Sequence, residues 1–132
     1  MESETHRSLR TVRHGLRGWG GWSMQLSDNE KLAIEEFGRR VKEKYGEKVR
    51  LIRLYGSKVR GDSDRFSDID LFVLVKEKNQ EIGDFILDAA FEMNLKYDVL
   101  LSVVVYDEKG FNNPIVQATP FIKNMIREGV QV

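Results

Sequence analysis

The chain has 132 residues, of which 41% are hydrophobic, and this is the size and composition of one ordinary domain. The 21 basic and 21 acidic residues give a formal net charge of zero, which disfavours stable binding to nucleic acid. The absence of cysteine excludes disulfides and thiolate metal sites. No apolar run approaches the roughly 20 residues that cross a bilayer, so we expect a cytoplasmic protein without membrane contact.

Residues 1–23 differ in composition from the rest of the chain. They combine four arginines with a glycine-tryptophan stretch at 18–22, and no helical or strand period persists among them. We therefore predict a disordered tail over 1–23 and one folded domain over 24–132. Because Met24 directly precedes the ordered pattern, we also hypothesise that native translation starts there.

The first predicted helix begins near Ser27 and ends at Gly46. Ser27 and Glu30 have the spacing of a capping box, which satisfies the unpaired amides of a helix start. Glycine is a natural helix stop. Apolar residues recur between these ends at three- and four-residue steps: Ile34, Phe37, Val41 and Tyr45.

The rest of the domain alternates strands and helices. In chain order we predict a strand at Val49–Tyr55, a polar loop at Gly56–Ser67, a strand at Ile69–Val75, a helix at Gln80–Leu95, a strand at Asp98–Tyr106, a turn at Asp107–Gly110 and a last helix from Thr119 to Gly129. This order predicts an α/β (α+β) fold, with a small mixed sheet of three to four strands flanked by helices.

Two short motifs flank the polar loop. Gly56-Ser57 follows a strand, where glycine permits a sharp turn and the next amides can bind phosphate oxygens, although an isolated Gly-Ser is more often a simple turn. Asp68-Ile69-Asp70 begins a strand, so both carboxylates point to the same face and repel each other. Magnesium would neutralise that repulsion, and two solvated carboxylates are the alternative explanation.

A third carboxylate, Asp98, stands at the start of the predicted valine-rich strand. If that strand lies beside Ile69–Val75, Asp98 joins the pair, and three carboxylates can hold two metal ions. In this arrangement Asp98 is also the best-placed general base. An ordinary aspartate at a strand start is the alternative. The two histidines, His6 and His14, lie in the predicted tail, which leaves carboxylate–metal chemistry as the best-supplied option in the domain.

Together these motifs resemble the nucleotidyltransferase superfamily that includes DNA polymerase beta. Its pattern is Gly-Ser, ten residues, then Asp-x-Asp, and Gly56-Ser57 and Asp68-Ile69-Asp70 match that spacing without gaps. The resemblance implies phosphate binding by Gly56 and Ser57. It implies metal and catalytic roles for Asp68, Asp70 and Asp98, with two Mg²⁺ ions and ATP as substrate. Arg60 would contact the triphosphate, with Lys58 and Arg65 as weaker candidates of the same kind.

The chain is most similar to minimal nucleotidyltransferases, which pair with helical toxins of the HEPN family. That resemblance implies an antitoxin that transfers AMP to a tyrosine of the toxin. Because larger superfamily members add an acceptor-binding domain, we expect the acceptor to be held by a separate helical protein or by a homodimer mate. Two alternatives stay open: adenylylation of a small molecule, and a non-catalytic antitoxin that neutralises its partner by contact.

Overall fold

The computed structural model describes residues 26–61 and 67–132. The predicted tail over 1–23, the proposed start at Met24 and the candidate Arg65 lie outside the described residues. The described elements, in chain order, are α2 (Asp28–Tyr45), a 3₁₀ turn (Gly46–Lys48), β1 (Val49–Tyr55), α3 (Ser57–Arg60), β2 (Ile69–Val75), α4 (Gln80–Tyr97), β3 (Leu101–Asp107), α5 (Glu108–Phe111), α6 (Pro114–Gln117), α7 (Pro120–Glu128) and β4 (Val130–Gln131).

The four strands form one mixed sheet in the order β3-β2-β1-β4. β1 lies antiparallel to both β2 and β4, whereas β2 and β3 run parallel. The parallel pair is joined through α4, which is the usual crossover for such strands. The predicted fold class, an α/β sheet of three to four strands flanked by helices, is confirmed.

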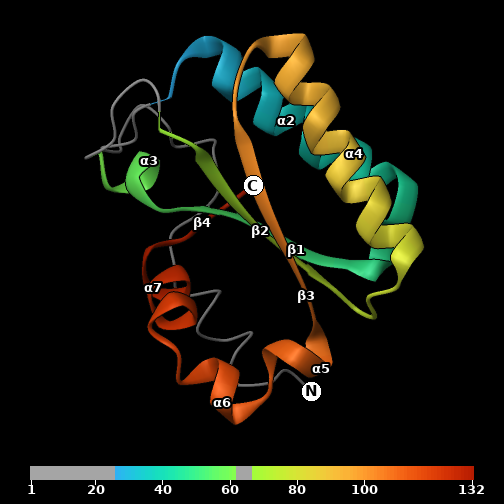
Figure 1. The fold of residues 1–132 in the computed structure, drawn as a ribbon, viewed down its shortest axis with the longest axis vertical. Coiled ribbons are helices and arrows are strands. Elements are labelled where there is room, and N and C mark those ends of the chain that lie inside the picture. The colour runs from blue at the N-terminus through green and yellow to red at the C-terminus, as the bar shows by residue number, and fades with distance from the viewer. Residues whose placement is uncertain (1–25, 62–66) are drawn as a thin grey trace.

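Helices cover both faces of the sheet (Figure 1). The long helices α2 and α4 lie side by side over one face, and α5, α6 and α7 lie on the other. The first face packs the odd-numbered residues of β2 and β3 against the long helices: Ile69, Leu71, Val73, Val75, Leu101, Val103 and Val105. The second face buries Phe72 and Leu74 with Phe111, Ile122 and Met125. The last helix therefore covers the sheet face that also carries Asp70, within the same chain.

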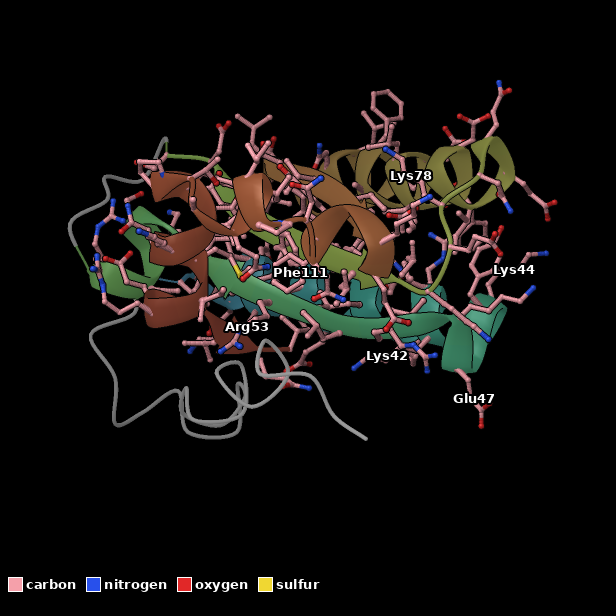
Figure 2. All side chains as sticks on the ribbon, turned by 90° about the horizontal axis from the view of Figure 1, so that it is seen from below. Lys42, Lys44, Glu47, Arg53, Lys78 and Phe111 are labelled. Atoms are coloured by element: carbon pink, nitrogen blue, oxygen red, sulfur yellow. The ribbon has the colours of Figure 1, made fainter. Side chains whose placement is uncertain are left out.

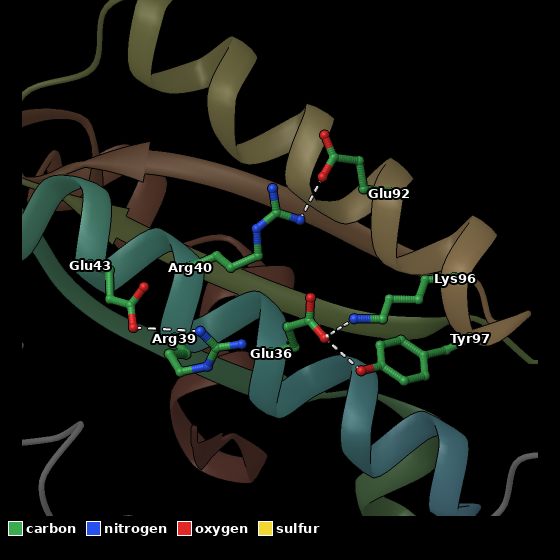
Figure 3. Close-up of polar contacts among 7 residues, drawn as sticks. All are labelled: Glu36, Arg39, Arg40, Glu43, Glu92, Lys96 and Tyr97. Atoms are coloured by element: carbon green, nitrogen blue, oxygen red, sulfur yellow. Dashed lines mark hydrogen bonds and ion pairs between the residues drawn. The ribbon is translucent and has the colours of Figure 1, made fainter.

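Polar side chains join α2 to α4 along their outer edges (Figure 3). Glu36 accepts a hydrogen bond from the Lys96 ammonium at 2.8 Å and another from the Tyr97 hydroxyl, while Arg40 pairs with Glu92. The bonds from Lys96 and Tyr97 hold the pKa of Glu36 below its ordinary value of 4.5. Exposed pairs of this kind contribute little energy, but they show that the two helices run in opposite directions.

A buried arginine lies under the second helical layer. Arg53 of β1 is fully buried and donates a hydrogen bond from Nη2 to the Gly129 carbonyl at 2.6 Å. Figure 2 labels it with Phe111 on the face of the sheet that α5–α7 cover. Burial lowers the pKa of Arg53 to about 10, so the guanidinium stays charged at neutral pH and ties the end of α7 to the sheet.

The predicted helix ends agree with the structure where local signals set them. Ser27 and Glu30 form the capping box, Thr119 caps α7 with Pro120 in its first turn, and Gly46 ends α2 at a positive φ of 53°. From Asp107 onward, three features differ. Asp107–Gly110 is not a simple turn, because Asp107 caps the short helix α5. Helix α6 and strand β4 were not predicted. Over the described residues, no helix has the length and apolar character that crossing a membrane requires.

Candidate active site

The turn between β1 and α3 places the two motifs in contact. Gly56 has a φ of 85° and ψ of −157°, a conformation that is essentially restricted to glycine. A Cβ at this position would lie 2.4 Å from Oδ2 of Asp70. Glycine is therefore required twice, for the backbone angle and for the space. The Asp70 carboxylate consequently lies directly against the backbone that leads into α3.

Ser57 follows as the first residue of α3. Backbone N–H groups at a helix start point out along the axis and are suited to phosphate oxygens. The turn is closed behind them by the Gly56 carbonyl, which accepts from the amides of Val59 and Arg60 at 3.1 and 3.2 Å. Gly56 thus lies immediately beside Asp70, and Ser57 is the next residue along the chain. Their phosphate-binding role stays a prediction.

The two aspartates of the second motif differ in environment. Asp68 is exposed just before β2, whereas Asp70 is half-buried within it. Burial and then the charge of Asp68 raise the pKa of Asp70 above its ordinary value of 3.8, and Arg60 opposes this shift. The carboxylates are therefore close enough to destabilise each other when both are ionised. Paired carboxylate oxygens of this kind fit one hard divalent ion such as Mg²⁺.

Arg60 lies at the end of α3 and is close enough to Asp70 to influence its pKa. Its Nη1 pairs with Glu128 at the end of α7 at 3.1 Å, and 44% of its side chain is exposed. A triphosphate that contacts Arg60 would therefore have to share the guanidinium with Glu128. The pairing of Arg60 with Glu128 could not be inferred from the local sequence, because the two residues are 68 positions apart.

Lys58 does not fit the role of a triphosphate contact that the sequence suggested. Its side chain is 2% exposed, and its Nζ lies 3.1 Å from the Glu30 carboxylate. Glu30 also accepts from the Ser27 amide in the capping box of α2. Lys58 therefore links α3 to the start of α2. In the sequence it belongs to the predicted polar loop, whereas in the structure it forms a buried ion pair with Glu30.

The prediction that Asp98 begins a strand beside Asp70 is wrong. Helix α4 continues to Tyr97, and Asp98 is its C-cap, exposed and in the left-handed conformation at φ 54°. Strand β3 begins only at Leu101. Over residues 26–61 and 67–132, no three Asp, Glu, His or Cys side chains are grouped so that they could hold a metal ion. Within the described residues, Asp68 and Asp70 therefore form a pair, and the metal and catalytic roles of Asp98 stay predictions.

Two neighbours of Asp70 were missed by sequence reasoning. Tyr55 of β1 and Ser102 of β3 are its partners across the sheet, so Tyr55, Asp70 and Ser102 form one row on the same face. Burial and then the charge of Asp70 raise the pKa of Tyr55 to about 12. Tyr55 also packs edge-on against Phe121 of α7, with ring centroids 5.5 Å apart. The alternation of side chains along β3 would have placed Ser102 beside Asp70 only if the register of β3 against β2 had been known.

Comparisons with known proteins show which family the chain resembles. A family model described as "Nucleotidyltransferase domain" matches residues 34–132. The chain is 35% identical over 101 residues to a Methanocaldococcus jannaschii protein named "Putative protein adenylyltransferase", covering 76% of this chain and 95% of that protein. A second protein of the same name and organism is 33% identical over 100 residues, covering 75% of this chain and 94% of that protein.

Two solved structures are also similar to the chain. One is described as a toxin-antitoxin with AMP-PNP, at 24% identity and a TM-score of 0.49, and it covers 74% of this chain and 70% of its own. The other is a mutant of the toxin-antitoxin MntA-HpeT, at 20% identity and a TM-score of 0.48, covering 80% of this chain and 72% of its own.

Proposed function

Because the chain belongs to the nucleotidyltransferase domain family, we propose that it transfers AMP from ATP to a tyrosine hydroxyl of a helical, HEPN-type partner protein and so acts as an antitoxin. The observation that carries the proposal is the approach of Asp70 to the backbone at Gly56. It brings a carboxylate pair suited to Mg²⁺ beside a helix start suited to phosphates. The names of the two archaeal relatives support a protein as the acceptor and AMP as the transferred group.

The reaction exchanges one phosphorus–oxygen bond for another. The acceptor oxygen forms a bond with the α-phosphorus, the bond from that phosphorus to the bridging oxygen breaks, and pyrophosphate leaves with the electron pair. The proton of the acceptor hydroxyl passes to solvent. Mg²⁺ held by Asp68 and Asp70 would supply charge neutralisation at the triphosphate. Ser57 and the Gly56 turn would orient the phosphates, and such positioning supplies much of the rate enhancement in phosphoryl-transfer chemistry.

The test is transfer of label from α-labelled ATP in the presence of magnesium. The full chain is incubated alone, with the helical protein encoded beside it, and with small hydroxyl or amine acceptors. Asp68→Asn/Asp70→Asn is the test variant. Asp84→Asn/Asp88→Asn, which removes two exposed carboxylates of α4, is the matched control. Label on a partner tyrosine that the control retains and the test variant loses is the expected result.

The alternatives predict different outcomes of the same assay. Label found only on a small molecule would replace the protein acceptor by a small-molecule substrate. Tight partner binding without transfer from any of the four triphosphates would favour an antitoxin that acts by contact. In that case Asp68→Asn/Asp70→Asn would still protect cells against the partner, whereas an enzymatic antitoxin would lose its protection.

A further inference from the structure

The side chain beside Asp70 on the neighbouring strand is a serine. β2 and β3 run parallel with Ile69 opposite Leu101 and Asp70 opposite Ser102. Parallel strands in register direct paired residues to the same face. The hydroxyl of Ser102 therefore occupies the place in the sheet from which a third carboxylate would most directly join Asp70.

Asp98 is held away from this row by hydrogen bonds to the end of α4. Its own amide and that of Val99 both donate to the Asn94 carbonyl, and the Leu101 amide donates to the Asn94 side chain at 2.8 Å. These bonds fix the chain from Asp98 to Leu100 as a helix cap. Strand pairing begins at Leu101, so Asp98 stands four positions before Ser102, the residue paired with Asp70.

We propose that the Asp68–Asp70 pair binds one divalent cation tightly and that Ser102 leaves the described part of the site without the third carboxylate needed to hold a second. This inference rests on the proposed function. Two divalent ions carry four positive charges, whereas the two carboxylates of Asp68 and Asp70 carry two negative charges. With two carboxylates, one ion is neutralised by the protein, and a second would depend on the nucleotide alone. Cation affinity in oxygen sites follows the number of charged ligands.

The experiment counts bound Mn²⁺ by its electron paramagnetic resonance, with the full chain and one equivalent of the non-hydrolysable α,β-methylene analogue of ATP. We expect one tightly bound ion per chain in the wild type. Ser102→Asp should add a second site, with an affinity at least about tenfold above the wild-type background. Asp98→Asn should leave the count unchanged, whereas Asp68→Asn/Asp70→Asn should remove the tight ion.

Two tight ions in the wild-type chain would overturn the inference, whether the extra carboxylate came from Asp98 or from residues 62–66. An unchanged count in a folded Ser102→Asp variant would overturn it as well. If that variant does not fold, as judged by circular dichroism, the numbers of Mn²⁺ ions bound by the wild type and by Asp98→Asn still decide whether the inference holds. The count is read without any transfer reaction. One tight ion without AMP transfer would therefore remove only the proposed function, and transfer with two tight ions would remove only this inference.

Discussion

Replacing Gly56 by alanine tests the contact on which the site is built. The variant must place a non-glycine residue at φ 85°, ψ −157°, at a cost of about 1–3 kcal/mol. Its Cβ would also lie 2.4 Å from Oδ2 of Asp70, so the carboxylate or the turn must move. A displacement of about 1 Å at a reacting centre can reduce a rate about a hundredfold. We therefore expect a melting temperature lower by about 10 °C and a similar hundredfold loss of transfer.

Gly46→Ala is the matched control for this experiment. Gly46 also has a positive φ, 53°, but nothing lies within 4 Å of a Cβ at that position. Its alanine variant should lose stability through backbone strain and keep Mn²⁺ binding and label transfer at temperatures where it is folded. Thermal unfolding followed by circular dichroism, together with the transfer assay at 20–25 °C, separates the two effects. Wild-type transfer by Gly56→Ala, or equal losses in both variants, would refute the reasoning.

Three further substitutions test the energetics around the site. Lys58→Met leaves Glu30 without its buried partner at 3.1 Å, and urea unfolding should show a loss of about 3 kcal/mol; a loss below 1 kcal/mol would contradict a structural ion pair. Gly129→Ala places a Cβ 2.9 Å from Nε of Arg53, and the same measurement should show a loss of about 1–3 kcal/mol. Asp70→Asn should stabilise the metal-free protein at neutral pH, because the raised pKa makes the wild-type free energy of unfolding fall as pH increases from about 3.8 through the higher folded-state pKa. Magnesium should stabilise the wild type and not this variant, as followed by thermal unfolding.

Much of the fold was predictable because its signals are local. The capping box at Ser27, the stop at Gly46 and the Thr119-Pro120 start of α7 each depend on residues within one turn of one another. The strands β1 and β2 were bounded by the same polar loop that carries the motif. Short pieces such as β4 escaped prediction because Val130 and Gln131 become a strand only by pairing with Leu54 and Arg53.

The end of α4 shows why the third carboxylate was misplaced. Tyr97 belongs to the helix because its hydroxyl bonds Glu36 and its carbonyl accepts from Asn29, both on α2. These contacts span more than 60 positions of sequence and cannot be read from local periodicity. A valine-rich segment after an aspartate favours a strand beginning at the aspartate, but packing against α2 extends the helix beyond its predicted end at Leu95 to Tyr97, and Asp98 becomes its C-cap.

The candidate site likewise contains one part that local sequence determines and one part that long-range contacts determine. Gly56 directly follows β1 and Asp70 lies on β2, and these adjacent antiparallel strands are joined by one connection, so the contact follows from a contiguous motif. Ser102 reaches the same row only through the parallel pairing of β2 with β3, whose register is set by how α4 crosses the sheet. The motif can therefore predict the carboxylate pair. The total charge of the metal site also depends on which residue of β3 is paired with Asp70. In this chain that residue is neutral, and metal binding is where the difference should be measurable.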